Sequence, residues 1–399
     1  MKIYYGKSVH GAEEINAVLK TISKSTQMGK NTELMENKIG KLFYKKYSLM
    51  VNSGSSALLL AFKSVNFEKG SNVITPVLTF STTVSSIIQS DLLPNFVDVK
   101  KETMCINEDL IESSINSNTR AICVPNLIGN IPDWIKIKKI AKKYNLLVIE
   151  DSADSLGAKI NNNSTGKYSD ISITSFYGSH IINCAGNGGM VCFKNKKFFL
   201  KAKLLRSWGR SSSLFKDSEK IENRFNIKID GIEYDRKFIF EEIGYNLEPS
   251  EIGASFGLVQ LRKLNKNIIK RQKFFKMHFD FFSKLNKYFN NPFIYKNVNT
   301  SFLAFPFTIK EESGIKRKDL QIFLEKRNIQ TRVVFTGNIL KQPGFKNIKH
   351  VSKYKNFKNA DYIMKNSILI GCHHGMTKSQ IKYIHNSIES FISYKYSSI

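Results

Sequence analysis

Short apolar runs alternate with segments of helical periodicity through the first half of the chain. The runs predict strands at Tyr47–Val51, Val73–Thr75, Asn95–Val99, Arg120–Pro125, Leu146–Ile149, Ile171–Phe176 and Met190–Phe193. Helical spacing covers 13–44, a segment from Ala57, a segment ending near Gln89, 107–115 and 132–144. Strands that alternate with helices are typical of a mostly parallel sheet with helices on both faces. This pattern predicts an α/β fold.

The pattern changes after residue 207. Residues 207–245 are polar and irregular, and a long helix with an apolar face begins near Pro249. From about residue 263 the sequence is basic and aromatic, with strands expected at 300–309 and 330–335 and helices at 317–327 and 377–393. We predict a large α/β domain over 1–262 and a smaller α+β domain over 263–399.

Five cysteines lie scattered along the 399 residues, and none forms a CxxC pair. An odd number at wide spacing fits neither a disulfide framework nor a structural zinc site. No apolar run is long enough to cross a membrane, and the first residues lack the apolar core of a signal peptide. We therefore expect a cytoplasmic protein without a metal site or a membrane segment.

The formal net charge of +28 is strongly basic. Such a charge is one mark of nucleic-acid-binding proteins. Here the lysines are spread throughout the chain beside many Asn and Ile residues, and the densest basic stretches are those of solvated helix faces. We expect no nucleic-acid binding, although a basic surface would attract a diphosphate substrate.

Polar side chains follow several predicted strands at their carboxyl ends, where α/β proteins keep their sites. Gly54, Ser55 and Ser56 begin a helix whose free N–H groups favour a phosphate, although an ordinary serine N-cap explains them equally. Ser175 and His180 follow another strand. A single histidine beside glycines is more often structural than catalytic, so these residues need further support.

Three carboxylates, Glu150, Asp151 and Asp154, follow a fully apolar strand. Ionised carboxylates at a buried sheet edge need a cation, either a metal ion or a protonated nitrogen. No accompanying His or Asp spacing indicates a metal, and Asp151 suits a protonated ring nitrogen. Phe80 is either a core residue or a face on which a flat ring can stack.

Together these motifs resemble the pyridoxal-phosphate sugar aminotransferases of the DegT type, from about residue 5 to 395. The motifs that carry the resemblance, in order, are Asn52–Leu58, Thr75-Pro76 with Thr79-Phe80, Glu150-Asp151 with Asp154, Ser175–Tyr177, Gly188-Gly189 and Gly244–Asn246. The resemblance implies the aspartate-aminotransferase fold (fold type I), with a large, mostly parallel sheet domain and a smaller α+β domain. It also implies activity on nucleotide-linked keto sugars.

The resemblance implies a role for each matching residue. Its cofactor contacts are Gly54, Ser55, Ser56 and Ser175 for the phosphate, Phe80 for the ring face, Asp151 for the ring nitrogen and Asp154 near the ring hydroxyl. An aspartate at the ring nitrogen keeps the ring an electron sink. Asn246 would reach the phosphate in a neighbouring subunit, which implies a homodimer with shared active sites.

His180 departs from the aminotransferase pattern, which has a lysine here that holds the cofactor covalently. Imidazole has no primary amine, and the motif is similar to the 3-dehydratase branch of the family. The segments around Arg210, Arg332 and Asn338 also fit that branch. These three residues are candidate substrate contacts, although single arginines form surface ion pairs nearly as often.

The branch implies removal of the C3 hydroxyl from a nucleotide-linked 4-keto-6-deoxyhexose, with L-glutamate as amine donor and pyridoxal or pyridoxamine 5′-phosphate as cofactor. His180 would act as base and then acid, and the nitrogen would leave as ammonia. Such a reaction belongs to deoxysugar and lipopolysaccharide biosynthesis. Two alternatives stay open: an aminotransferase that works without the lysine, and a catalytically silent protein that binds the cofactor.

A CDP-linked enzyme of this branch binds a [2Fe–2S] cluster through cysteines after its Trp-Gly-Arg motif. The corresponding segment here, Ser211–Leu214, contains no cysteine, so we expect no iron–sulfur cluster and no reductase partner.

Two features of the segment after His180 depart from the family pattern. The spacing from His180 to Gly188 is one residue longer than in the family, and Asn187 stands where glutamate is expected.

Overall fold

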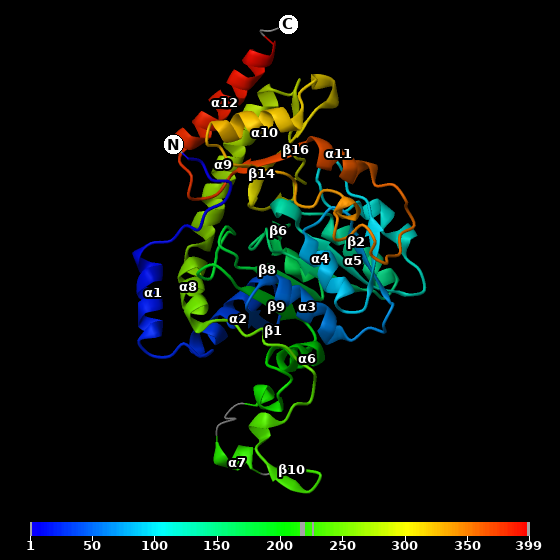
Figure 1. The fold of residues 1–399 in the computed structure, drawn as a ribbon, viewed down its shortest axis with the longest axis vertical. Coiled ribbons are helices and arrows are strands. Elements are labelled where there is room, and N and C mark those ends of the chain that lie inside the picture. Colours follow the sequence, from blue (N-terminus) through cyan, green and yellow to red (C-terminus); the bar gives the residue numbers. More distant parts are fainter. Residues whose placement is uncertain (1, 216–219, 226, 397–399) are drawn as a thin grey trace.

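A computed structural model describes residues 2–215, 220–225 and 227–396 (Figure 1). Its centre is a seven-stranded sheet in the order β1-β9-β8-β5-β4-β2-β3. The strands are β1 (Tyr47–Val51), β2 (Asn72–Pro76), β3 (Leu93–Val97), β4 (Thr119–Pro125), β5 (Leu147–Asp151), β8 (Ile171–Ser175) and β9 (Gly189–Phe193). Only the pairs that β9 makes are antiparallel, so the predicted mostly parallel sheet is confirmed.

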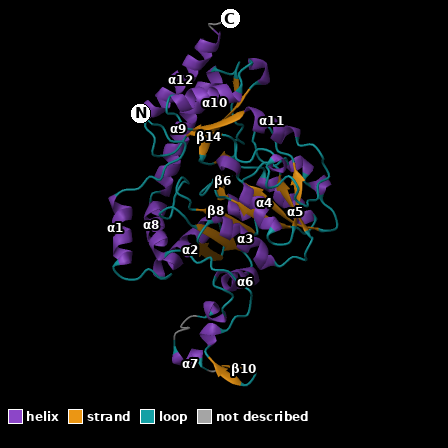
Figure 2. Cartoon of the chain, viewed as in Figure 1, coloured by secondary structure: helices purple, strands orange, loops and turns teal. Residues whose placement is uncertain are grey.

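Helices cover both faces of this sheet, and Figure 2 shows the strands at the centre between them. One face packs against α3 (Gly54–Val65), α4 (Ser81–Ile88) and α6 (Lys196–Arg206), and the other against α2 (Lys30–Leu42), α5 (Trp134–Lys143) and α8 (Glu251–Arg262). Within β5, Val148 joins the core beneath α5 and Ile149 the core beneath α3. Burial on both sides explains why such strands are continuous apolar runs in the sequence.

The ends of β1 and β8 meet at one edge of the sheet. Val51 and Ser175, their last residues, both pair with Gly189, the first residue of β9. On the next strand, Asp151 pairs with Ile173 of β8. The strand ends therefore bring the start of α3, the β5 carboxylates and the loop after Ser175 to one place.

The C-terminal part of the chain folds around a second, antiparallel sheet in the order β12-β14-β16-β15. Its strands are β12 (Phe289–Asn290), β14 (Ala304–Ile309), β15 (Thr331–Arg332) and β16 (Ser367–Gly371), and its helices are α9 (Leu264–Lys284), α10 (Arg317–Lys326), α11 (Lys358–Asn366) and α12 (Lys378–Tyr396). Ile3 bridges to Ile329 and is buried in the same core. The domain division at residues 262 and 263 falls between α8 and α9 and stays a prediction.

The described residues between 211 and 243 form an arm that projects from the body of the molecule (Figure 1). It carries α7 (Ile221–Arg224) and the hairpin β10 (Ile227–Ile229) with β11 (Ile232–Tyr234). Its exposed apolar side chains include Ile221, Phe225, Ile232, Phe238, Phe240 and Ile243. A small sheet of β6 (Lys159–Ile160), β7 (Asn163–Ser164) and β13 (Val298–Asn299) joins the two parts of the chain.

Two helical predictions differ from the structure. The segment 13–44 forms two helices, α1 (Ala12–Ile22) and α2. The helical spacing predicts an apolar face at Ile15, Val18, Leu19 and Ile22; in the single chain Val18 is half-buried and the other three are exposed. The segment 107–115 forms only two short 3₁₀ turns, Glu108–Leu110 and Glu112–Ser114. The Ser113 and Ser114 hydroxyls both donate to the Leu110 carbonyl, local bonds that compete with the backbone bonds of a regular helix.

Candidate active site

A cavity of about 520 Å³ opens at the carboxyl edge of the large sheet. Its lining comes from the start of α3, the ends of β5 and β8, the loop 176–188, the N-terminal segment and the C-terminal part of the chain. Residues of this lining that bear on chemistry are Tyr5, Gly54, Ser55, Phe80, Asp151, Asp154, Ser175, His180, Leu303 and Phe335. The structure thus brings His180 together with all the predicted cofactor contacts except Ser56 and Asn246.

Helix α3 begins at this cavity. The Ser53 hydroxyl accepts a hydrogen bond from the Ser56 N–H at 3.1 Å, so the serine N-cap is present. The other N–H groups of the first turn have no partner inside the helix. A Cβ at Gly54 would lie only 2.7 Å from the Ser175 Cβ, and this glycine lets the helix start approach the Ser175 hydroxyl. The convergence of these donors suits a phosphate.

Two buried carboxylates face the cavity. Asp151 accepts hydrogen bonds from the Ala153 N–H and the Thr83 hydroxyl, each at 3.1 Å, and burial raises its pKa to about 6. Asp154 accepts the Ile128 N–H at 2.9 Å. Burial, and then the charge of Asp151, raise the pKa of Asp154 to about 7. A cation in the cavity would stabilise the ionised form of both carboxyls.

The His180 ring is held in one tautomer. Its Nδ1 lies 3.2 Å from the Ser175 carbonyl oxygen, which can only accept, so Nδ1 carries a proton. The Nε2 atom, which then holds the free lone pair of the neutral ring, lies 3.8 Å from Asp154 Oδ1. Burial lowers the pKa of His180 to about 4, and the charge of Arg271 acts in the same direction, so the neutral ring is favoured.

Aromatic rings form another part of the lining. Phe80 is 52% exposed and packs edge-on against Phe335 of the C-terminal part, with ring centroids 5.7 Å apart. Tyr5 comes from the N-terminal segment, and the Arg332 guanidinium lies 5.6 Å from the centre of its ring. The open Phe80 ring at the cavity offers a face on which a planar ligand can stack.

The two other predicted cofactor contacts lie outside this lining. The Ser56 hydroxyl donates to Asn52 Oδ1 at 2.6 Å, and Ser56 lines a neighbouring cavity beside Gly188. Asn246 pairs with Ser207 in an isolated bridge at the base of the arm. Within one chain, Asn246 therefore does not reach the cavity that holds His180.

The three predicted substrate contacts also lie outside the lining. The Arg210 guanidinium stacks on Trp208 at 4.3 Å, at the base of the arm. Arg332 is exposed beside Tyr5. Asn338 is buried, and its amide donates to Asp361 Oδ1 at 2.8 Å and accepts the Leu340 N–H at 3.1 Å. Their roles in substrate binding stay predictions.

Sequence reasoning missed several lining residues. Tyr5, Leu303 and Phe335 reach the cavity through the packing of distant segments, and none of the sequence motifs predicts them as site residues. Asn126 also lines the cavity, and its amide donates to Glu150 at 3.0 Å and to Ser152 at 3.1 Å. Its place directly after β4, at the same sheet edge, is a signal that could have found it.

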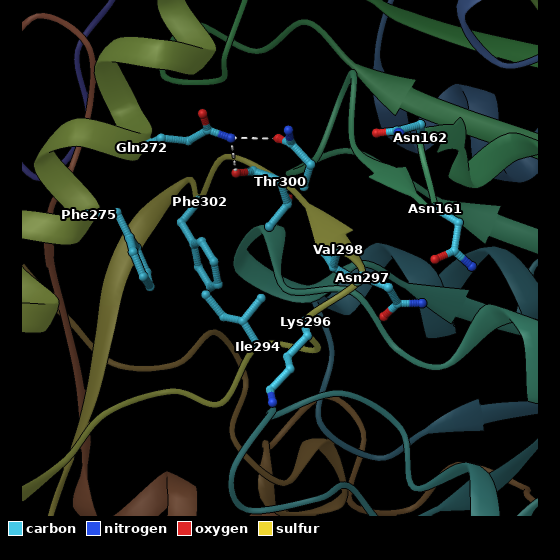
Figure 3. A pocket seen from close by; sticks show the side chains of 11 residues that line it. Asn161, Asn162, Gln272, Phe275, Ile294, Lys296, Asn297, Val298, Thr300 and Phe302 are labelled. Carbon is cyan, nitrogen blue, oxygen red and sulfur yellow. Dashed lines mark hydrogen bonds between the residues drawn. The ribbon is translucent and has the colours of Figure 1, made fainter.

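A second cavity, of about 560 Å³, lies beside the segment 294–302 (Figure 3). Its lining is mostly amides and apolar rings, and the Gln272 amide donates to Asn299 at 2.7 Å and to the Thr300 carbonyl at 2.9 Å. Lys296 is the one charged side chain among the described residues of this lining. Because this cavity lacks a carboxylate or a histidine, the cavity at His180 is the candidate active site.

Neither a metal site nor a membrane-spanning helix occurs within the described ranges. No group of three or more His, Cys, Asp or Glu residues there could hold a metal ion. No helix in that part of the chain is long and apolar enough to span a membrane. All five cysteines are buried free thiols.

The sequence profile of the DegT/DnrJ/EryC1/StrS aminotransferase family matches residues 9–389. The chain belongs to this family. The family depends on pyridoxal phosphate, so the predicted cofactor is confirmed.

Individual proteins are similar to this chain over most of its length. The lipopolysaccharide biosynthesis protein RfbH of Salmonella typhimurium is 31% identical, over 96% of this chain and 90% of that protein. A GDP-4-keto-6-deoxy-D-mannose 3-dehydratase of Escherichia coli O55:H7 is 30% identical, over 91% of this chain and 92% of that protein. The solved structure of E. coli GDP-4-keto-6-deoxy-D-mannose-3-dehydratase with bound hydrated PLP matches with a TM-score of 0.87 at 28% identity, over 97% of this chain and 100% of that chain. These likenesses confirm the fold class and show an aminotransferase-like, sugar-modifying enzyme type.

Proposed function

We propose that this protein removes the C3 hydroxyl of a nucleotide-linked 4-keto-6-deoxyhexose, with L-glutamate as amine donor and with release of ammonia. The observation that carries the proposal is His180, whose imidazole faces the cavity with Nε2 unprotonated. No lysine occurs among the described residues of that lining. The similarity to a GDP-4-keto-6-deoxy-D-mannose 3-dehydratase and to RfbH supports a role in deoxysugar and lipopolysaccharide synthesis.

The cavity residues fit pyridoxal phosphate. The start of α3 at Gly54 and Ser55, with the Ser175 hydroxyl, would hold the phosphate. Asp151, a buried carboxylate without a cationic partner among the described residues, would pair with the protonated ring nitrogen. The exposed ring of Phe80 would cover one face of the pyridine ring. When bound, pyridoxal phosphate supplies an electron sink for the bond that breaks.

His180 would move the protons of the reaction. Its Nδ1–H is held by the Ser175 carbonyl, so Nε2 is the atom that accepts a proton from the reacting carbon and returns one to the departing hydroxyl. Asp154, 3.8 Å away, would stabilise the imidazolium that forms between these steps. Imidazole has no amine that could take the place of a lysine in returning the product. The nitrogen that came from glutamate would therefore be hydrolysed from the sugar and leave as ammonia.

We also propose a homodimer with shared active sites. The arm exposes Ile221 (72%), Ile232 (67%) and Ile243 (97%) to solvent in the single chain. Exposed apolar side chains gathered on one projecting element are typical of a protein interface. Asn246 lies at the base of this arm, outside its own cavity, which suits a contact with the phosphate in the other subunit. Arg210, also at the base, and Arg332 would meet the substrate diphosphate or the glutamate carboxylate.

The fate of nitrogen tests the reaction. The protein, pyridoxal phosphate and ¹⁵N-glutamate are incubated with GDP-, CDP-, UDP- and dTDP-linked 4-keto-6-deoxyhexoses, and the products are analysed by mass spectrometry. We expect a 3-deoxy-4-keto sugar without nitrogen, together with labelled ammonia. A sugar that retains ¹⁵N would replace this proposal with an aminotransferase.

Two matched variants test the residue. His180→Asn should lower the turnover by about 10²- to 10⁴-fold, the usual contribution of a general acid–base group, while the cofactor still binds. His350→Asn, at an exposed position outside the cavity lining, should leave turnover unchanged. If His180→Asn alters only cofactor affinity, the protein is a cofactor-binding homologue without this activity.

A further inference from the structure

Arg271 of α9 is a fully buried cation that no acidic side chain pairs with in the described part of the chain. Its guanidinium uses all five N–H groups, four on backbone carbonyls and one on an imidazole. Burying an arginine without a carboxylate is costly, and carbonyl dipoles offset that cost only when their geometry is fixed. Such a residue specifies the position of the groups that it binds.

The four carbonyls come from two segments, 179–180 and 302–303, that each contribute to the lining of the candidate active site. Nη2 donates to the carbonyls of Ser179 and His180 at 3.4 and 3.2 Å. Nη1 donates to those of Phe302 and Leu303 at 3.1 and 3.0 Å. Ser179 and His180 belong to the loop after β8, and Leu303 lines the same cavity from the C-terminal part of the chain. One planar group therefore fixes the spacing between the two segments.

The fifth N–H extends this arrangement further into the C-terminal part of the chain. Arg271 Nε donates to His374 Nδ1 at 3.2 Å, so the neutral His374 ring carries its proton on Nε2. His374 Nε2 is buried and has no hydrogen-bond partner. Because His374 Nε2 makes no hydrogen bond, the bond that Nδ1 accepts from Arg271 sets the orientation of the His374 ring.

The guanidinium also acts on His180 through its charge. The titratable groups that face the His180 ring are Asp154 at 3.8 Å, the Tyr177 ring at 6.0 Å and Arg271. The positive charge disfavours a second positive charge on His180 and favours the ionised form of Asp154. Arg271 therefore favours the neutral form of the His180 ring and also fixes the backbone of His180.

We infer that Arg271 is a positioning residue of this site: its guanidinium holds the His180 backbone against the segment 302–303 and keeps the imidazole aimed into the cavity. This inference rests on the proposed function, because it makes His180 the group that moves protons. Arg271 itself is not among the residues that line the cavity. It acts through the loop that carries His180.

Arg271→Lys is the main test, because it keeps the charge and removes the planar set of donors. We expect kcat to fall about 10²-fold while KM changes less than about threefold, as for a misplaced catalytic group. Lys270→Met, which removes the exposed cation next in sequence, should leave both constants unchanged. A kcat of Arg271→Lys within about threefold of the wild type would overturn the inference.

A second readout does not depend on turnover. Deuterium exchange at the imidazole C2 of each histidine, followed by mass spectrometry against pH in the protein without added cofactor, reports the pKa and accessibility of His180. Arg271→Lys should speed the His180 exchange, whereas Lys270→Met should not. An unchanged His180 exchange would overturn the inference even if the wild type proves to have no dehydratase activity, a result that by itself would refute only the proposed function.

His374 provides a milder pair of variants in case Arg271→Lys does not fold. His374→Leu removes the acceptor of Arg271 Nε, and His374→Gln can restore it through its amide oxygen. We expect kcat to fall and His180 exchange to rise in His374→Leu, with recovery in His374→Gln. Equal behaviour of the two variants would mean that the hydrogen bond to Arg271 does not position the loop.

Discussion

At the level of single residues, the chemistry of the cavity depends on which nitrogen of His180 carries the proton. The Ser175 carbonyl fixes that proton on Nδ1, so Nε2 is free to act as a base without any change of tautomer. Ser175 thus serves twice, through its carbonyl toward His180 and through its hydroxyl toward the predicted phosphate position. A change in the backbone at Ser175 would therefore disturb both base and cofactor.

The pH dependence of activity follows from burial of His180. An imidazole acts as a base only when neutral, so activity is lost as the pH falls through its folded-state pKa. Burial lowers this pKa from 6.5 to about 4, and kcat/KM should therefore show no imidazole limb near 6.5. Initial rates between pH 4.5 and 8 measure the profile.

Asp154 supplies the control for that profile, because burial raises its pKa to about 7. A limb near pH 7 that disappears in Asp154→Asn belongs to this carboxyl. A limb near 6.5 that persists in Asp154→Asn would contradict the assignment of a neutral, buried His180.

The sequence predicted the residues of the candidate site best where they stand at the end of a predicted strand. Asp151, Ser175 and Gly54 follow apolar runs, and the topology of a parallel sheet places such positions together. Tyr5 and Phe335 lie more than three hundred positions apart in sequence and enter the cavity through tertiary packing. Arg271 lies within a long basic helix, where nothing in the pattern separates a buried cation from its solvated neighbours.

Among the secondary-structure elements, β9 holds the site edge in place. Gly189, its first residue, sits between β1 and β8 and directly beneath the start of α3. A Cβ there would lie 2.2 Å from the Ser53 carbonyl oxygen and 2.7 Å from the Gly54 nitrogen. The strand and the helix start can approach this closely only because the residue is glycine.

Gly189→Ala should therefore cost about 1–3 kcal/mol in the free energy of unfolding, as overpacking does, and weaken cofactor binding. Urea unfolding and an absorbance titration with pyridoxal phosphate measure the two effects. Gly344→Ala, where a Cβ meets no atom within 4 Å, should change stability by less than about 0.5 kcal/mol. Similar stability losses in both variants would contradict the role of the close approach.

The sequence pattern predicted elements best where both faces are buried. All seven strands of the large sheet occur close to their expected positions. A short continuous apolar run bounded by turn residues is typical of a strand that is buried on both faces. The prediction was poorer on the surface of the single chain. Helix α1 has the expected period, but the pattern could not show that Ile15, Leu19 and Ile22 would remain exposed.

For the molecule as a whole, exposed apolar side chains on the arm lead us to expect a dimer. Light scattering after gel filtration should give twice the chain mass of 45.6 kDa. The double variant Ile232→Asp with Phe238→Asp should shift the mass toward that of one chain, because charges replace apolar contacts. Ile322→Asp, at an exposed position on α10, should remain dimeric. A wild-type mass of one chain at micromolar concentration would refute the shared-site proposal.

The pairing of Ile3 with Ile329 has a consequence for the order in which the molecule is assembled. A ribosome delivers about 5–20 residues per second, so Ile3 waits roughly 20–60 seconds for its partner to be made. The large sheet, whose strands all lie between Tyr47 and Phe193, can form during this delay. Contacts between such distant positions form late because of the entropy of closing so long a loop. Tyr5 therefore joins the cavity in one of the last folding steps, and a chain truncated before Ile329 would carry an open, incomplete site.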